Sequence, residues 1–220
     1  MSVDSGPENR VAAIVLAAGA ARRFGRPKQL EQWPSAVGPT LVERAVGLTL
    51  AATAGPVLVV VGNQQKAVEE VLARQVNSPR VKPVFNPRWE EGQGFSVAAG
   101  VKAANELVPP VEGALIMLTD QPRLRVETLK TLLEQFAGLG EAGREKILFP
   151  VFEGKRGNPV IFGRNFFEEL TRLEGDVGGR AVVRKYPQAI IEVAVTDPAI
   201  HEDVDTPEEL AKLLDTGGEG

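Results

Sequence analysis

Short hydrophobic runs alternate with longer amphipathic stretches along most of the chain. The runs are rich in β-branched residues and lie at 11–16, 57–61, 81–85, 114–118, 147–152, 160–162 and 189–195. Such runs, separated by helical patterns, predict βαβ units and therefore a mostly parallel sheet of about seven strands. The segments 14–16 and 58–61 are hydrophobic at every position, as expected for strands that helices cover on both faces. The pattern predicts an α/β protein, folded as a three-layer α/β/α sandwich.

Polar residues mark where two of the helices begin and where the sheet becomes exposed. Thr40 is followed by Glu43, and Thr206-Pro207 by Glu209, which is the spacing of a capping box. We therefore expect helices to begin directly after Thr40 and Thr206. Glu192 interrupts the last hydrophobic run, which favours a less buried or edge strand there.

Length and composition indicate one globular domain. The chain has 220 residues, of which 43% are hydrophobic and 25% charged, within the range of ordinary soluble proteins. We expect a single domain over residues 11–215. The ends, 1–10 and 216–220, are polar and have no hydrophobic face to bury, so both are predicted to be flexible.

Charge and cysteine content exclude several classes of protein and site. The net charge of -4 argues against a general nucleic-acid-binding protein, which needs a basic excess. The chain has no cysteine, so disulfides, thiolate metal sites and cysteine nucleophiles are excluded. The polar start lacks the features of a secretory signal, and no apolar run is long enough to span a membrane. We expect a cytoplasmic protein without membrane contact.

A loop of small and basic residues follows the first predicted strand, from Leu16 to Leu30. Small side chains let backbone N–H groups approach an anion, and basic side chains balance its charge, so this loop is predicted to bind phosphate. The pattern GxGxxG would need glycine at Ala21, and the Walker pattern would need lysine directly after Gly25. A nicotinamide dehydrogenase is therefore disfavoured. The alternative interpretation is a tight strand-to-helix turn followed by a solvated basic stretch.

Two loops further along the chain carry carboxylates. Asp120 follows a hydrophobic run, and open α/β sheets bind ligands beyond the carboxyl ends of their strands. Asp203 and Asp205 precede the last predicted helix, where Thr206 already fills the capping position. Mg²⁺ binds a few carboxylates together with water and phosphate, so Asp120 and Asp205 are the candidate metal ligands. The alternative is that these aspartates only start a turn and cap a helix.

The first loop resembles the signature of nucleotidyltransferases that activate sugars, isoprenoid precursors and molybdenum cofactors. It contains Leu16-Ala17-Ala18-Gly19 followed by Arg23, Gly25 and Pro27-Lys28. Five further segments are similar to the molybdenum-cofactor cytidylyltransferases of the MobA-like NTP transferase superfamily: 86–97, 119–122, 154–160, 173–180 and 203–210. This likeness extends from about Val11 to Leu214. It implies the Rossmann-like fold of the nucleotide-diphospho-sugar transferases.

The resemblance also implies roles for individual residues. Arg23, Lys28 and Asp120 would be catalytic, and Asp120 and Asp205 would hold Mg²⁺. The implied nucleotide-binding residues are Leu16, Ala17, Ala18, Gly19, Arg23, Lys28, Gly94, Ser96 and Asp120. The implied acceptor-binding residues are Arg156, Gly157, Asn158, Pro159, Asp176, Gly178 and Arg180.

The chain departs from the family pattern at two positions, with Asn158 in place of the usual histidine and Gln93 in place of methionine. Without the resemblance, 154–159 would be interpreted as a hairpin turn and 175–179 as a loop before a helix. Trp89 and Phe95 would then be packed side chains.

These features predict a Mg²⁺-dependent cytidylyltransferase that transfers CMP from CTP to the terminal phosphate of molybdopterin and releases pyrophosphate. The alternatives are a GTP-dependent guanylyltransferase, the same chemistry on a sugar phosphate, and a non-catalytic carrier of the finished cofactor. The expected partners are small-molecule substrates and a molybdoenzyme or its chaperone, without nucleic acid. No general base is required, because a phosphate nucleophile is already anionic near neutral pH.

Overall fold

An eight-stranded sheet forms the centre of the computed structural model, which describes residues 11–21 and 23–215. The strands are β1 (Val11–Leu16), β2 (Val57–Val61), β3 (Val81–Phe85), β4 (Gly113–Leu118), β5 (Ile147–Phe152), β6 (Lys155–Arg156), β7 (Val160–Gly163) and β8 (Ile190–Ala194). Each predicted run corresponds to a strand, and β6 is an addition within the segment 154–159. The ends predicted to be flexible, 1–10 and 216–220, lie outside the described residues.

Parallel strands build one half of the sheet, and β7 reverses direction in the other half. β1 pairs in parallel with β2 and β4, and β2 with β3. β7 is antiparallel to both β4 and β5, whereas β8 runs parallel to β5 along its other edge. Within the described chain, β3 and β8 each have a single neighbour. The edge position predicted from Glu192 is confirmed.

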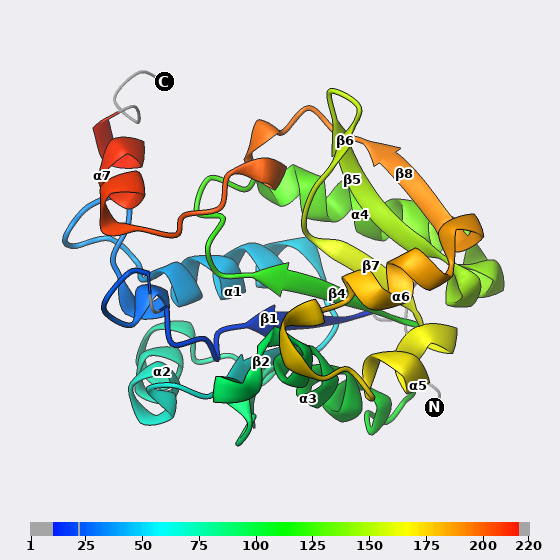
Figure 1. Cartoon of the computed structure of the whole chain (residues 1–220), viewed down its shortest axis with the longest axis horizontal. Coiled ribbons are helices and arrows are strands. Elements are labelled where there is room, and N and C mark those ends of the chain that lie inside the picture. Colours follow the sequence, from blue (N-terminus) through cyan, green and yellow to red (C-terminus); the bar gives the residue numbers. More distant parts are fainter. Residues whose placement is uncertain (1–10, 22, 216–220) are drawn as a thin grey trace.

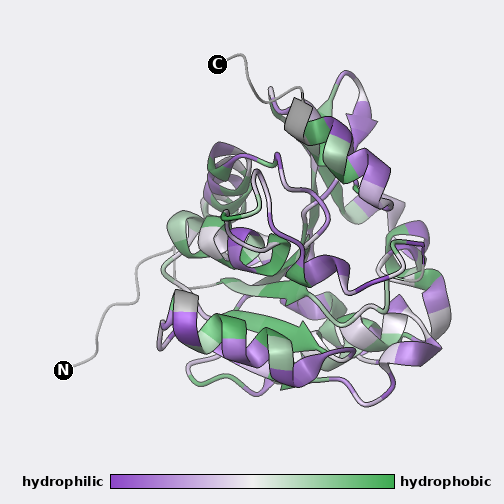
Figure 2. Ribbon diagram, turned by 90° about the vertical axis from the view of Figure 1, so that its left-hand side faces the viewer, coloured by the Kyte–Doolittle hydropathy of each residue, from purple (hydrophilic) through white to green (hydrophobic). Residues whose placement is uncertain are grey.

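Helices cover both faces of the sheet, as predicted for a three-layer sandwich (Figure 1). α1 (Leu41–Ala52), α2 (Gln65–Val71) and α4 (Val126–Gly138) contribute to the hydrophobic cluster on one face. α3 (Gln93–Asn105), α5 (Phe167–Leu170) and α6 (Arg180–Lys185) contribute to the cluster on the other. The strands are hydrophobic along most of their length, while the helices alternate in hydropathy (Figure 2). The sheet is thus buried between two amphipathic layers.

Both predicted capping boxes form. The Glu43 carboxylate accepts the Thr40 N–H at 2.6 Å, and the Thr40 hydroxyl accepts the Glu43 N–H at 3.3 Å. At the start of α7 (Pro207–Asp215), the Glu209 carboxylate accepts the Thr206 N–H at 3.1 Å, and the Thr206 hydroxyl accepts the Glu209 N–H at 3.2 Å. These bonds satisfy N–H groups that lack partners within the helices.

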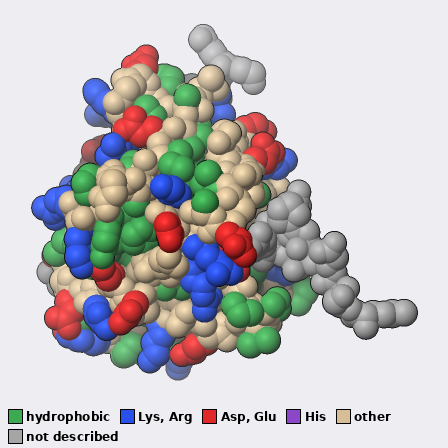
Figure 3. Space-filling view, turned by 90° about the vertical axis from the view of Figure 1, so that its right-hand side faces the viewer, with side chains coloured by type: hydrophobic (Ala, Val, Ile, Leu, Met, Phe, Trp, Pro, Cys, Tyr) green, Lys and Arg blue, Asp and Glu red, His purple; other side chains and the backbone are tan. Residues whose placement is uncertain are grey.

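Charged side chains of both signs are interspersed on the face that carries α5 and α6 (Figure 3). On α5 and its surroundings, Arg172 pairs with Glu168 and Lys185 with Glu169. Among the helices that the structure describes, none combines the length and the apolar character that crossing a bilayer requires.

Candidate functional site

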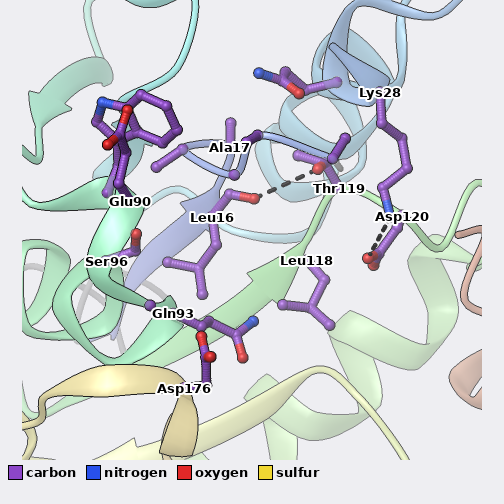
Figure 4. Close-up of a pocket in the computed structure, with 17 residues that line it drawn as sticks. Leu16, Ala17, Lys28, Glu90, Gln93, Ser96, Leu118, Thr119, Asp120 and Asp176 are labelled. Carbon is purple, nitrogen blue, oxygen red and sulfur yellow. Dashed lines mark hydrogen bonds and ion pairs between the residues drawn. The ribbon is translucent and has the colours of Figure 1, made fainter. Parts of the chain in front are cut away.

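A cavity of ≈ 400 Å³ opens beyond the carboxyl ends of β1 and β4, the edge at which open α/β sheets bind ligands. Figure 4 shows Lys28 and Asp120 at one end of this first cavity and Glu90 at the other. The segment 16–21 and residues 118–120 form part of its wall, together with the start of α3. The volume is in the range of small-molecule sites.

A second cavity of ≈ 390 Å³ adjoins the first and extends toward β5, β7 and α6. Its lining combines hydrophobic side chains of the sheet with charged and polar side chains of the surrounding loops. Leu16, Gln93, Leu118, Asp120 and Asp176 line both cavities. Two ligands bound side by side would therefore meet at Asp120.

Lys28 lies where the two cavities join, between two carboxylates. Its Nζ is 3.0 Å from Oδ2 of Asp120 and 3.3 Å from Oδ1 of Asp205, and it donates to the carbonyl of Val204 at 2.6 Å. Arg23 approaches the same centre from the first loop, with Nη2 2.9 Å from Oδ2 of Asp205. The structure thus brings together four residues that come from three separate loops.

Local backbone structure holds these side chains in place. Lys28 begins a 3₁₀ turn that includes Gln29, which is 3% exposed and donates to the Asn63 carbonyl at 3.3 Å. The Val204 N–H donates to the backbone carbonyl of Asp120 at 2.8 Å. The two acidic loops are therefore tied to each other through the main chain.

The residues at this junction suit a divalent cation. Oδ1 of Asp120 is buried and has no hydrogen-bond partner among the described residues, and such an atom is costly unless a cation or water reaches it. The Lys28 ammonium shows that positive charge is held between Asp120 and Asp205. Among the described residues, no group of three or more His, Cys, Asp and Glu side chains could hold a metal. Substrate phosphates and water would have to complete the coordination shell.

A third carboxylate, Asp203, lines the second cavity close to this pair. Partial removal from water raises its pKa, and the negative charges of Asp120 and Asp205 raise it further. Asp205, rather than Asp203, contacts both Lys28 and Arg23. The site therefore concentrates negative charge around the position that a cation would occupy.

The residues assigned to nucleotide binding lie mostly around the first cavity. Leu16, Ala17, Ala18, Gly19, Lys28, Ser96 and Asp120 line it. Gly94 lies behind the wall, where a Cβ atom would come within 2.8 Å of the carbonyls of Glu174 and Gly175. Arg23 lines the second cavity, and its side chain is 75% exposed.

The residues assigned to acceptor binding gather around the second cavity. Arg156, Gly157, Asn158, Asp176, Gly178 and Arg180 line it. Pro159, which follows a cis peptide bond, is not part of the lining. A Cβ atom on Gly157 would meet the Ile200 carbonyl at 2.4 Å, and the Asn158 N–H donates to that carbonyl at 3.1 Å. This segment thus packs against Ile200, which precedes the loop that carries Asp205.

Several residues that line the cavities have no role predicted from the sequence. In the first cavity these include Gln29, Trp89, Glu90 and Thr119, and in the second Phe149, Val160 and Phe162. The proximity of Gln29 to Lys28 and of Thr119 to Asp120 in the sequence would have identified two of them. The strand residues carry no such signal, because a cavity-lining side chain and a core side chain are both hydrophobic.

Comparisons with known proteins identify the family of this chain. The family model for the MobA-like NTP transferase domain matches residues 13–190. Nicotine blue oxidoreductase of Paenarthrobacter nicotinovorans is 31% identical over 208 residues, which cover 93% of this chain and 96% of that protein. A probable molybdenum cofactor guanylyltransferase of Bacillus cytotoxicus is 27% identical over 165 residues, which cover 74% of this chain and 73% of that protein.

Solved structures show the same fold. The crystal structure of Rv0371c from Mycobacterium tuberculosis H37Rv has a TM-score of 0.75 at 25% identity and covers 94% of this chain and 99% of its own. A structure of Rv0371c in complex with manganese has a TM-score of 0.70 at 26% identity and covers 94% of this chain and 100% of its own. The matched segment, 13–190, covers most of the chain and includes every residue that lines the first cavity. The chain therefore belongs to the family of proteins with a MobA-like NTP transferase domain.

Proposed function

We propose that this nucleotidyltransferase transfers CMP from CTP to the terminal phosphate of molybdopterin and releases pyrophosphate. The observation that supports this most directly is the pair of adjoining cavities with Asp120 in their shared wall. Transfer between two bound substrates requires that the reacting phosphates meet, and holding them there supplies much of the rate enhancement.

In the proposed arrangement the nucleotide occupies the first cavity. The small residues 17–19 leave the backbone free to approach its phosphates, while the Lys28 ammonium and the Arg23 guanidinium lie at the junction. An oxygen of the acceptor phosphate attacks the α-phosphorus. The bond from the α-phosphorus to the oxygen that bridges it to the β-phosphate breaks, and pyrophosphate leaves with that electron pair. Lys28 and Arg23 stabilise the charge that develops on it.

A divalent cation, Mg²⁺ in our proposal, would be held by Asp120 and Asp205 and would neutralise charge on the reacting phosphates. The unpartnered Oδ1 of Asp120 supports this assignment. The manganese complex of Rv0371c, a protein 26% identical to this chain, adds support for a divalent cation in the family.

The second cavity would take the acceptor. Hydrophobic side chains of Val97, Ile116, Val160 and Phe162 form one part of its lining, and basic side chains, among them Arg180, form another. This combination suits an organic body that carries phosphate. A second candidate is transfer of GMP from GTP, because a relative that covers 74% of this chain is named as a guanylyltransferase.

The proposal is tested by incubating the protein and MgCl₂ with each of the four nucleoside triphosphates, with and without molybdopterin, and measuring pyrophosphate release. Release that requires both CTP and molybdopterin is the expected result. Asp120→Asn should reduce the rate about 100-fold or more, whereas the exposed-carboxylate control Glu208→Gln should leave it unchanged. Full activity in Asp120→Asn, with its fold verified by circular dichroism, would refute the role of that carboxylate.

Two further measurements separate this proposal from other classes of protein. The relative named as an oxidoreductase calls for an assay of NADH and NADPH oxidation, in which we expect no reaction. Isothermal titration with the cofactor product distinguishes an enzyme from a carrier. A carrier would bind that product tightly and release no pyrophosphate from any triphosphate, and this outcome would overturn the proposed activity.

A further inference from the structure

A third hydrophobic cluster lies apart from the two that sandwich the sheet. It contains Phe24, Trp33, Leu41, Val204 and Leu210, each at most 8% exposed. Phe24 lies in the loop 16–30, which we call the phosphate loop, and Trp33 lies in the segment after it. Leu41 begins α1, Val204 lies in the loop that carries Asp205, and Leu210 belongs to α7. The cluster therefore joins two of the three loops that meet at Lys28, the one that carries Arg23 and Lys28 and the one that carries Asp205, and we call it the satellite cluster.

Val204 connects the satellite cluster directly to the charged centre. Its side chain is 2% exposed within the cluster. Its carbonyl accepts the Lys28 ammonium at 2.6 Å, and its N–H donates to the Asp120 carbonyl at 2.8 Å. A shift of the Val204 backbone would move Lys28, Asp120 and the adjacent Asp205 relative to one another.

α7 also contacts the loop that carries Asp205. The Glu209 carboxylate accepts the Asp205 N–H at 2.7 Å, and Leu210 contributes the α7 side chain that is buried in the satellite cluster. Arg123, in the loop after Asp120, donates to the Leu213 carbonyl at 3.2 Å. Figure 1 shows α7 at the periphery, beside the loop that follows β1 and away from the middle of the sheet. The helix is thus placed to support the loops rather than the main core.

α7 lies outside the segment that the family model matches. The family model ends at residue 190, so Asp205 and α7 lie beyond the matched segment. We infer that α7 is a brace for the active site and that Leu210 is a positioning residue, which holds Val204 and Asp205 against the phosphate loop through the satellite cluster. The effect of Leu210 on catalysis rests on the proposed nucleotidyl transfer, whereas its effect on the position of Val204 and Asp205 does not depend on that function.

Leu210→Ala tests the brace, with Leu132→Ala as the matched control. Leu132 lies in α4, is fully buried and belongs to a main cluster instead of the satellite cluster. Hydrogen exchange of the protein without ligands is followed by mass spectrometry. Leu210→Ala should accelerate exchange of the Val204 N–H, and of the Leu41 N–H that donates to Glu31, while the amides of β1 and β4 keep their protection. Leu132→Ala should leave both loop amides at wild-type rates.

A binding measurement on the same variants provides a readout that general destabilisation would not move. Leu210→Ala should weaken binding of the manganese complex of CTP about tenfold, as loss of residues that orient metal ligands does elsewhere. Leu132→Ala, although less stable to urea, should bind normally, and Leu210→Met should restore affinity.

Unchanged exchange at Val204 in Leu210→Ala would overturn the brace. Equal weakening of CTP binding by Leu210→Ala and Leu132→Ala would overturn the positioning role. If the wild-type protein bound no nucleoside triphosphate, the proposed function would fail, and the exchange measurement alone would still decide whether α7 supports these loops.

Discussion

Replacing Lys28 with methionine removes the one ammonium that the structure places between Asp120 and Asp205, while keeping an unbranched side chain. The substitution removes the cation from between the two carboxylates and leaves Asp205 paired with Arg23 alone. It also removes the donor to the Val204 carbonyl at 2.6 Å. We therefore expect the metal-free variant to be less stable than the wild-type protein.

The structure sets the size of this loss. The Lys28 side chain is 13% exposed, and those of Asp120 and Asp205 are 21% and 34% exposed. Breaking a fully buried pair costs about 3–5 kcal/mol, whereas exposed pairs contribute about 0–1 kcal/mol. For this intermediate burial we expect a decrease of about 2 kcal/mol in the free energy of unfolding, which lowers the Tm of a chain of this size by about 4–8 °C.

Urea denaturation with and without MgCl₂ checks the reasoning, with the exposed Lys66→Met as the control. A divalent cation can replace the missing ammonium in Lys28→Met, and saturation at 100-fold above its Kd would contribute about 2.7 kcal/mol. The wild-type protein should gain less, because its own ammonium must first leave the carboxylates. If Mg²⁺ stabilised Lys28→Met no more than it stabilises the wild type, the idea that lysine and metal share this position would be refuted.

Two other substitutions probe the surroundings of the site and the surface. Gly94→Ala places a Cβ atom 2.8 Å from the Glu174 and Gly175 carbonyls, so it should lower the free energy of unfolding by about 1–3 kcal/mol and raise the KM for the acceptor by displacing Asp176. The control Gly47→Ala has open space around the new Cβ and should change neither quantity. An unaltered KM in Gly94→Ala would contradict the effect of this packing on the acceptor site. Hydrogen bonds from Tyr186 and Lys185 lower the pKa of Glu169, so its charged form stabilises the fold above the ordinary carboxyl pKa of about 4.3, and this contribution is lost as the pH falls through the lowered value. Glu169→Gln should therefore be less stable than wild type to urea at pH 7, and the difference should shrink as the pH falls through the lowered pKa of Glu169, whereas a difference independent of pH would exclude this linkage.

The fold followed from the sequence because its main signals are local. Uninterrupted hydrophobic runs identified the strands, and the capping boxes at Thr40 and Thr206 fixed two helix starts. β6 was not predicted because its two residues, Lys155 and Arg156, pair with β5 across a turn and show no hydrophobic pattern. The antiparallel direction of β7 was also not apparent, since strand direction depends on the connection and not on the run itself.

The site was only partly accessible to the same reasoning. Position after a strand selected Asp120, and the resemblance to nucleotidyltransferases selected Lys28; the structure places the two side chains 3.0 Å apart. The role of Gly94 as a contact surface for Glu174 and Gly175 depends on a packing distance that spans about 80 residues of sequence. The satellite cluster was missed for a related reason, because Phe24, Trp33 and Leu210 are isolated hydrophobic residues that acquire a common environment only after folding.

The charge at the junction of the cavities suggests how the site accepts a polyanion. Arg23 pairs with Asp205, and Lys28 pairs with both Asp120 and Asp205, so these carboxylates satisfy the basic side chains before any ligand is present. A triphosphate that entered alone would have to compete with the aspartates for Lys28. A triphosphate that arrived with a divalent cation would supply the carboxylates with a replacement, which frees Lys28 for the phosphates. The same side-chain arrangement therefore stabilises the ligand-free loops and favours nucleotide and metal entering together.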